Sequence, residues 1–352
     1  MSIMLHIPNV DGQPRPPFIS PMSTTLRNRF TVDRKGGTFA ITENDLAILS
    51  LFNVYEYLPS TFIGAMVPWL HPVYIKNRLT ILRHELEFLE VPAPSWEAAN
   101  ARYRPAIYKR GKKGTDALRD RGRDATDIRH KKEFRHELGV NLIAASFDIG
   151  SKEYPNLSLI TKEDILDHKA CPASTRKARE PLKIEAPFTY KGRNGKQIPV
   201  ENAHILHDWY PMGICHTMGE RTLRLFMPGV EFDRRSEPLD TEDYERSSIT
   251  KKLCQMLELF KRYDGIDGYQ EHYGIPNAVI PFWTINEIHM RSMMRRLHEI
   301  TEGKGSDRIL FGNMSDFSTF EKLPLPTGWA LSYDYKRVGF TDFNFLKELQ
   351  VP

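Results

Sequence analysis

The sequence predicts a two-domain protein that mixes helices and strands, with a small, mainly helical N-terminal domain followed by a larger mixed α/β domain. Its 352 residues exceed the about 100–200 residues of a typical single domain. Apolar residues recur at helical spacing from Thr42 to Phe88, which predicts consecutive amphipathic helices. From Pro155 onward, short apolar runs alternate with turn residues and longer helical stretches, a pattern typical of a mixed α/β domain.

The composition is that of a globular protein. Apolar residues make up 40% of the chain and charged residues 27%. No apolar run approaches the length of about 20 residues that a membrane span needs. Residues 1–17 lack the basic start and apolar core of a secretory signal. The cysteines Cys171, Cys215 and Cys254 stand far apart, which argues against a disulfide scaffold or a cysteine-rich zinc module. We therefore expect a soluble cytoplasmic protein with no membrane partner.

Three segments are predicted along the chain. Residues 1–40 are rich in Pro, Gly, Ser, Thr and Arg without lasting periodicity, which is typical of a flexible arm. Residues 41–125 form the predicted N-terminal domain, and residues 126–352 form the larger domain.

The chain has neither a phosphate-binding G-x-x-x-x-G-K-[ST] loop nor a G-x-S-x-G elbow, so ATP hydrolysis and serine-hydrolase chemistry lack their usual sequence support.

The predicted helices of the N-terminal domain have clear starts and one clear apolar stripe. Thr42 and Asp45 have the spacing of a capping box at the start of the first helix. A short second helix is predicted over residues 61–67. The third helix, over residues 73–88, carries one apolar stripe formed by Ile75, Leu79, Leu82 and Leu86.

This order of helix, short helix, turn and longer helix predicts a helix-turn-helix. A strand over residues 103–110, a basic turn over 111–114 and a helix over 115–121 then predict a winged version, with an ordinary three-helix bundle as the alternative. In a DNA-binding unit, side chains opposite the apolar stripe would face the major groove, and the basic turn would contact phosphate at the wing tip. The predicted contacts to double-stranded DNA are Lys76, Asn77, Thr80, Arg83, Lys109, Arg110, Lys112 and Lys113.

Positive charge is concentrated between Arg102 and His136. That stretch holds thirteen Lys and Arg and five Asp and Glu, which gives a net charge of +8, against +4 for the whole chain. A charge excess of this density indicates a polyanion-binding segment. A solvated linker, in which the same residues serve only solubility, is the alternative.

The larger domain is predicted to alternate helices and strands. A helix over residues 127–148 is followed by strand-like runs, with a hairpin turn at Asn194-Gly195 and a bend at Pro228-Gly229. The predicted strands are 157–160, 204–206, 222–233 and 278–283, with closing strands at 308–311 and 329–335. Further helices are predicted over residues 247–263 and 286–302.

The strongest catalytic candidates are carboxylates on two neighbouring strands. Asp208 follows one strand, and Glu231 and Asp233 lie two residues apart on the next, so their side chains share a face. Such carboxylates can jointly bind Mg²⁺ or Mn²⁺, and Lys251 or Lys252 on the following helix could stabilise phosphate charge. The alternative is that the carboxylates form ion pairs with Arg234 and Arg235. A histidine metal site at His204, His207 and His216 is less favoured than half-buried structural histidines.

Several motifs resemble the plasmid replication-relaxation family. In the N-terminal domain these are Thr42, Asp45, Leu49, Tyr57-Leu58, Arg78-Leu79, Pro105, Tyr108, Gly114 and Leu118, which match the family's T-x-x-D…L…Y-L opening, R-L third helix and P-x-x-Y…G…L wing. In the larger domain, residues 136–141 are similar to its H-x-L-x-V-N helix. Residues 208–214 and 230–238 are similar to its P-D-x-x-x-x-G and E-x-D-R-G-T-E strands, and residues 248–253 to its lysine-bearing helix.

The resemblance implies a winged helix fused to a domain resembling the PD-(D/E)XK nuclease fold, in proteins of plasmids, phages and other mobile elements. The chain departs from that pattern at His207, where the fold usually has proline, and at Arg235, where the pattern has glycine. Asp233 stands where a working nuclease normally carries its catalytic lysine. Migration of that lysine to the next helix, at Lys252 or Lys251, would preserve the chemistry.

Two functions from different classes remain open. One is a metal-dependent DNA endonuclease or nicking enzyme with Asp208, Glu231, Asp233 and Lys252 as catalytic residues. In it, the three carboxylates hold Mg²⁺ or Mn²⁺. The other is a catalytically inactive, nuclease-fold regulator of replication or transcription. Double-stranded DNA is the expected partner in both, with a second copy of the chain, as a homodimer, as a further candidate partner.

Overall fold

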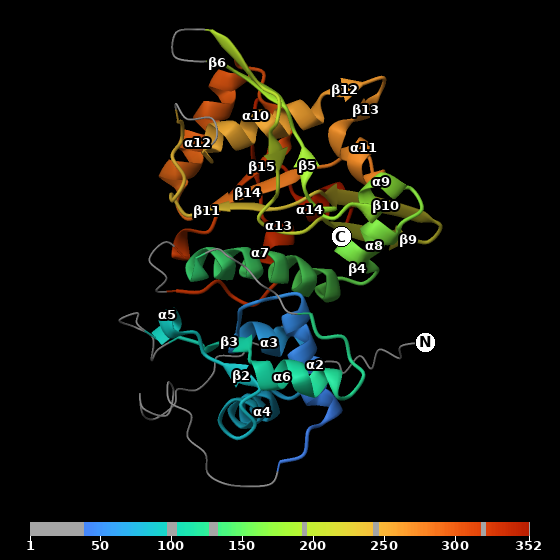
Figure 1. Ribbon diagram of the computed structural model, residues 1–352, viewed down its shortest axis with the longest axis vertical. Coiled ribbons are helices and arrows are strands. Elements are labelled where there is room, and N and C mark those ends of the chain that lie inside the picture. The colour runs from blue at the N-terminus through green and yellow to red at the C-terminus, as the bar shows by residue number, and fades with distance from the viewer. Residues whose placement is uncertain are drawn as a thin grey trace. The chain divides into compact units, whose positions relative to one another are not determined.

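The structure, a computed structural model, contains helices and several small sheets in a mixed α+β arrangement (Figure 1). The described residues are 39–96, 104–126, 133–191, 196–241, 246–317 and 322–351. Most of the predicted arm over residues 1–40 therefore lies outside them, as do Arg129, Lys131 and Lys132 of the basic segment. None of the helices in the described residues is both long enough and apolar enough to cross a membrane.

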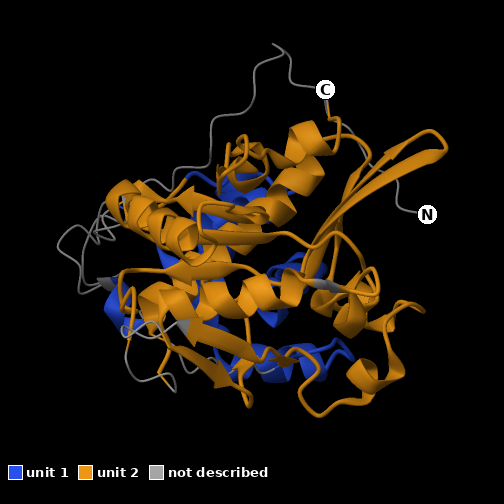
Figure 2. Ribbon diagram, turned by 90° about the horizontal axis from the view of Figure 1, so that it is seen from above, with its two compact units in different colours: residues 1–54, 58–128, 325–327 blue, residues 55–57, 129–324, 328–352 orange. Residues whose placement is uncertain are grey.

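The chain divides into two compact units (Figure 2). Unit 1 comprises residues 1–54, 58–128 and 325–327, and unit 2 comprises residues 55–57, 129–324 and 328–352. The main division, after residue 128, lies three residues from the boundary predicted after residue 125.

Unit 1 combines short helices with a three-stranded antiparallel sheet of order β1-β3-β2. The three predicted helices are confirmed, with ends shifted by a few residues. The elements in chain order are α2 (Glu43–Ser50), η1 (Leu51–Asn53), β1 (Leu58–Pro59), α3 (Ser60–Met66), α4 (Pro72–His84), β2 (Leu89–Glu90), α5 (Ala93–Trp96), β3 (Ile107–Arg110) and α6 (Lys112–Arg119).

The start of α2 is tied to α4 by a buried ion pair. The predicted capping box is confirmed, because Thr42 Oγ1 accepts from the Asp45 N–H and Asp45 Oδ2 accepts from the Thr42 N–H at 2.7 Å. Arg78 on α4 donates its Nε–H to Asp45 Oδ1 at 2.8 Å, and its Nη2 pairs with the other carboxylate oxygen. The Asp45 side chain is completely buried, so Arg78 is its charge partner in the core of unit 1.

The predicted basic turn over residues 111–114 is wrong. Gly111 is the N-cap of α6, and Lys112 and Lys113 form the first turn of that helix. The backbone N–H of Gly111 donates to the Phe88 carbonyl at 2.8 Å, which holds this helix start against the residue before β2. The antiparallel strands β2 and β3 pair with each other, so the connection between paired strands precedes β3, whereas residues 111–114 follow it. Lys112 and Lys113 therefore do not lie at a wing tip.

Unit 2 begins with the long helix α7 (Phe134–Glu153) and contains most of the strands. The other elements are β4 (Leu157–Ile160), α8 (Lys162–Asp167), α9 (Ala173–Lys177), β5 (Ile184–Glu185), β6 (Phe188–Lys191), β7 (Gln197–Val200), β8 (His204–Ile205), β9 (Met212–Met218), β10 (Arg221–Met227), β11 (Glu231–Asp233), α10 (Ile249–Phe260), β12 (Arg262–Tyr263), β13 (Ile266–Asp267), α11 (Gly268–Tyr273), β14 (Ile280–Thr284), α12 (Glu287–Ile300), β15 (Ser306–Asn313), η3 (Ser315–Phe317), α13 (Trp329–Ser332), β16 (Lys336–Val338) and α14 (Phe345–Glu348).

The sheet that positions the candidate site has the order β11-β14-β15-β16, with parallel pairing except at β16. Every residue of β14 is buried, as expected for a parallel strand covered on both faces. One face packs against α10, α11 and α12 through Ile280, Phe282, Leu253 and Met293. The helix α7 lies on the other side of β11 (Figure 1).

The bent strand predicted over residues 222–233 forms two separate strands in the structure. β10 pairs with β9, and after the predicted bend at Pro228-Gly229 β11 pairs with β14. The predicted hairpin before it has antiparallel strands β6 and β7, whereas its turn at Asn194-Gly195 lies outside the described residues. The predicted strand over 329–335 is wrong, because residues 329–332 form the short helix α13 against α7 and the edge strand begins only at Lys336.

Candidate active site

Backbone pairing brings Asp208 and Glu231 together. Trp209 donates its N–H to the Val230 carbonyl at 3.1 Å, which aligns the segment after β8 antiparallel to the start of β11. One residue along, Asp208 Oδ2 accepts the Phe232 N–H at 2.9 Å. The Asp208 carboxylate is thereby held beside β11 by a backbone hydrogen bond, with only 3% of its side chain exposed.

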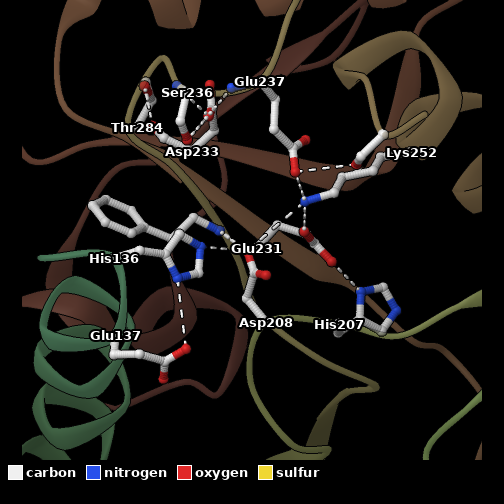
Figure 3. Close-up of polar contacts among 12 residues, drawn as sticks. His136, Glu137, His207, Asp208, Glu231, Asp233, Ser236, Glu237, Lys252 and Thr284 are labelled. Atoms are coloured by element: carbon white, nitrogen blue, oxygen red, sulfur yellow. Dashed lines mark hydrogen bonds and ion pairs between the residues drawn. The ribbon is translucent and has the colours of Figure 1, made fainter. Parts of the chain in front are cut away.

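Lys252 reaches this pair from α10. Ser248 caps α10, since its Oγ accepts the Lys251 N–H at 3.1 Å, and Leu253 and Met256 hold the helix against the sheet. Lys252 Nζ lies 2.8 Å from Glu231 Oε2 and 3.9 Å from Asp208 Oδ2 (Figure 3). Of the two lysines considered from the sequence, Lys252 is therefore the one whose ammonium group lies among these carboxylates.

The ammonium group of Lys252 stays charged at neutral pH. Burial by itself lowers the pKa of Lys252, but the charges of Asp208, Glu231 and Glu237 and the hydrogen bond with Glu231 outweigh burial and raise the pKa well above its ordinary value. The group is thus a fixed positive charge, and 13% of the side chain is exposed.

Asp233 faces the same side of β11 as Glu231 but reaches a different helix. Between them, Phe232 points to the opposite face, where its ring lies against His136 and Phe317, as alternation along a strand requires. Residues two apart on a strand are separated by about 6.6 Å. Glu231 therefore meets Lys252 on α10, whereas Asp233 Oδ2 meets His289 Nε2 on α12 at 2.5 Å. The predicted convergence is confirmed for two of the three carboxylates.

The pKa of Asp233 reflects its partners. Burial raises it, but the hydrogen bond from His289, the backbone N–H of Glu237, and the positive charges of His289 and Lys252 together lower it below its ordinary value. The sequence also allowed an ion pair between Arg234 and these carboxylates. In the structure, the Arg234 guanidinium pairs with Glu133 instead.

Glu237 is the third carboxylate beside Lys252, and sequence reasoning did not assign it a role. Its Oε1 lies 3.1 Å from Lys252 Nζ. Its Oε2 is buried and has no hydrogen-bond partner among the described residues. The sequence did carry one signal for Glu237, because this residue matches the second glutamate of the E-x-D-R-G-T-E motif.

Two histidines lie behind the carboxylates. His136 Nε2 on α7 is 3.3 Å from Asp208 Oδ2, and His207 Nδ1 is 2.7 Å from Glu231 Oε1. His216 instead bonds through Nδ1 to the Leu349 carbonyl at 2.7 Å. The structure thus favours structural partners over the histidine metal site considered from the sequence, since His207 and His216 are engaged by different groups.

The carboxylates beside Lys252 include two of the three residues predicted to bind a divalent cation. Asp208, in the segment after β8, and Glu231, on β11, carry oxygen atoms of the kind that Mg²⁺ prefers, and Glu237 Oε2 is a buried acceptor without a hydrogen bond in the described structure. Mg²⁺ commonly binds through one or two carboxylates and completes its coordination with water and phosphate. No group of three or more His, Cys, Asp or Glu within the described residues is arranged to hold a metal by itself. Asp233 is turned toward His289 and does not belong to such a ligand set.

The predicted DNA-binding residues of unit 1 fall into two groups. Asn77 and Thr80 are exposed on α4, and Lys76 is half-buried beside them. Arg83 is only 4% exposed, so the prediction that it faces outward is wrong: the turn of α4 on which it lies carries it into the interior, next to buried Leu82.

The two predicted contacts on β3, Lys109 and Arg110, have different surroundings. Arg110 is engaged inside unit 1, because Nε donates to Thr115 Oγ1 at 3.1 Å and Nη1 donates to the Leu49 carbonyl at 3.2 Å. Lys109 pairs at the surface with Glu90 at 3.1 Å. Of the predicted contacts, Asn77, Thr80, Lys112 and Lys113 are therefore exposed, and Lys76 and Lys109 are half-buried.

The chain was compared with protein-family models, with curated proteins and with solved structures, and none of them matches.

Proposed function

We propose that the protein binds double-stranded DNA through unit 1 and cleaves DNA at a divalent-cation-dependent site in unit 2. The observation that carries the proposal is the position of Lys252 Nζ, 2.8 Å from Glu231 and 3.9 Å from Asp208. A lysine beside an aspartate and a glutamate that backbone pairing brings together is the combination that a PD-(D/E)XK-like nuclease requires. In this chain Asp233 occupies the position where such nuclease sequences usually have the lysine. Lys252 on α10 supplies the ammonium group instead.

Each residue has a distinct role in this proposal. Asp208 and Glu231 hold the cation, which when bound activates water and neutralises phosphate charge as a Lewis acid. The Lys252 ammonium group stabilises the negative charge that develops on the phosphate oxygens, and it needs no reorganisation because Glu231 and Glu237 already fix it. Asp233 acts from outside the ligand set by shaping the turn that carries Glu237.

Support for DNA docking comes from the order of elements in unit 1. α3 and α4 are joined by a short turn and followed by antiparallel β2 and β3, which is the order of a winged helix-turn-helix. α4 buries Ile75 and Leu79 and exposes Asn77 and Thr80, so it has one core face and one hydrogen-bonding face. In this proposal α4 enters the major groove.

The proposal is tested by cleavage of supercoiled plasmid with Mg²⁺ or Mn²⁺. Wild type should convert it to nicked or linear DNA, and chelation should stop the reaction. Asp208→Asn and Lys252→Met should each lower the cleavage rate by about 10²–10³-fold. Both should retain binding to DNA measured without divalent cation. Lys261→Met is the matched control, because Lys261 lies just after the end of α10 and pairs with Glu258 at the surface. Cleavage that is equal in all variants would overturn the assignment.

A second function is favoured by one observation. Both oxygens of Glu231 are already engaged, Oε1 by His207 and Oε2 by Lys252, so the site is electrostatically compensated without a cation. This favours a catalytically inactive DNA-binding regulator of replication or transcription. DNA binding without cleavage of supercoiled, linear or single-stranded DNA in Mg²⁺ or Mn²⁺ would select this function over the nuclease. The origin in a plasmid or phage and the homodimer stay predictions.

A further inference from the structure

His207 lies between Glu231 and a buried tyrosine. Its Nδ1 is 2.7 Å from Glu231 Oε1, and its Nε2 is 3.2 Å from the hydroxyl oxygen of Tyr269 on α11. The side chains of His207 and Glu231 are 2% and 0% exposed, and Tyr269 is fully buried. The three side chains form a continuous buried chain that ends at Lys252 on the other oxygen of Glu231.

The backbone leaves space for this histidine at Gly229. A Cβ atom on Gly229 would come within 2.2 Å of the Cβ atom of His207, which no side chain can tolerate. The bend that separates β10 from β11 therefore passes directly against His207. Because Trp209 pairs with Val230 just beyond this point, the strand geometry that brings Asp208 to β11 also determines the position of the His207 ring.

The two partners of His207 differ in the hydrogen bonds that they can make. The Glu231 carboxylate accepts, so Nδ1 donates to it in this arrangement. The Tyr269 hydroxyl can donate to Nε2. Burial, followed by the charge of Glu231, raises the pKa of Tyr269 well above its ordinary value, which keeps that hydroxyl protonated. Every polar group in the chain from Tyr269 to Glu231 thus has a partner of the correct type.

We propose that His207 is a positioning residue for Glu231, which holds one carboxylate oxygen so that the other faces Lys252 and the cation site. This inference rests on the proposed function and extends it to a residue that stands where the related fold usually has proline. A carboxylate bound at one oxygen cannot rotate freely about its last bond. Hydrogen-bond partners of this kind orient ligands, and their loss typically costs 10–100-fold in activity or metal affinity.

The test compares two replacements of His207 that differ in one hydrogen bond. His207→Ala removes the donor to Glu231, and plasmid cleavage should fall about 10–100-fold while the dissociation constant for DNA stays the same. His207→Asn retains an N–H near the position of Nδ1 and should recover most of the rate. Tyr269→Phe, which keeps the ring and removes the hydroxyl, should lower the rate by a few-fold. His298→Ala, at an exposed histidine of α12, is the control.

The outcomes separate this proposal from the proposed function. If wild type cleaves and His207→Ala cleaves equally well, or His207→Asn is no better than His207→Ala, the positioning role is wrong. If wild type does not cleave at all, the nuclease function fails, and the His207 assignment is decided by the long-range ¹H–¹⁵N NMR spectrum of its ring. A proton on Nδ1 in wild type supports the donor role toward Glu231, and a proton on Nε2 alone overturns it.

Discussion

The carboxylate of Asp233 closes the turn that carries Glu237. Asp233 Oδ1 accepts the backbone N–H of Glu237 at 3.3 Å, and it also accepts from the N–H of Ser236 at 3.2 Å and from the Ser236 hydroxyl at 3.4 Å. Because this turn directs the Glu237 side chain toward Lys252, Asp233 contributes to the site through the backbone. Its other oxygen, Oδ2, contacts His289 and joins the turn to α12.

Removal of the Asp233 carboxylate should destabilise unit 2. Asp233→Ala leaves the N–H groups of residues 236 and 237 and the His289 ring without their acceptor, and we expect a loss of about 3 kcal/mol in the free energy of unfolding. Asp233→Asn retains one acceptor oxygen and should lose about 1–2 kcal/mol. Urea unfolding measures both. Asp342→Asn, at an exposed pair with Lys336, is the control and should change stability by less than about 1 kcal/mol.

The effect of Asp233 should depend on pH in a defined direction. The pKa of Asp233 is lowered in the folded protein, so its carboxylate stabilises the fold above the ordinary value of 3.8 and loses that contribution as pH falls through the lower folded value. The stability difference between wild type and Asp233→Asn should therefore shrink as pH falls below about 4. A difference that grows between pH 5 and pH 3.5 would contradict this role. Urea unfolding at pH 5, 4 and 3.5 provides the measurement.

Lys252→Met should leave an excess of buried negative charge. Asp208, Glu231 and Glu237 would then repel one another, and we expect a loss of about 3–5 kcal/mol. If the carboxylates can hold a divalent cation, Mg²⁺ should raise the melting temperature of this variant more than that of wild type, because the cation replaces the ammonium charge. Thermal melting with and without Mg²⁺ measures the effect. An equal response in Glu231→Ala would show that the cation binds elsewhere.

The ion pair between Arg78 and Asp45 should hold unit 1 together. Arg78→Met leaves the fully buried Asp45 carboxylate without its charge partner and should destabilise unit 1 by about 3–5 kcal/mol. Replacing both residues, as Arg78→Met with Asp45→Asn, should restore part of that loss because no buried charge remains. Hydrogen exchange of the α2 and α4 amides reports the effect locally. The control is Arg123→Met, at an exposed pair with Glu43, which should leave their protection unchanged.

Local sequence signals predicted most helix starts and the strand that carries the site. The capping residues Thr42 and Asn286 and the bend at Pro228-Gly229 act within a few residues, so they are readable from the sequence. Residues 329–335 were predicted as a closing strand, but residues 329–332 form the helix α13. This helix packs against α7, which precedes it by more than 170 residues, and the Ala330 N–H donates to Ser146 Oγ at 2.9 Å, 184 positions away. Contacts at such a distance in the chain cannot be read from the local sequence.

The candidate site was predictable only in part for the same reason. Asp208, Glu231 and Lys252 were found from strand and helix positions, and the structure brings them together. The roles of His207 and Glu237 could not be predicted from sequence periodicity. The His207 ring contacts residues 24 and 62 positions away in the chain, and the position of Glu237 depends on a turn closed by Asp233. Asp233 was assigned to the ligand set because alternation gives the face of a strand but does not distinguish the two helices that cover it.

The proposed binding of DNA by unit 1 predicts distinct effects for three side chains of α4. Asn77 and Thr80 are exposed, so Asn77→Ala should reduce discrimination between the preferred site and random DNA, by about 1–3 kcal/mol if the amide reads an adenine. Lys76→Ala should weaken binding to all sequences and reduce the salt slope by about 1. Arg83 is buried, so Arg83→Ala should lower the melting temperature without a specific loss of discrimination in the folded fraction.

Fluorescence anisotropy with specific and random duplexes across a salt series separates these outcomes. Lys152→Ala is the control, since Lys152 is an exposed lysine of unit 2 that pairs with Asp148 on the same helix. If Lys152→Ala flattens the salt slope as much as Lys76→Ala does, the loss reflects net charge and α4 has no privileged contact with phosphate. If Asn77→Ala leaves discrimination intact while Lys76→Ala flattens the slope, α4 approaches the DNA backbone but does not read bases. An effect confined to the two α4 variants, with Asn77 acting on discrimination and Lys76 on the slope, is what a recognition helix in the major groove requires.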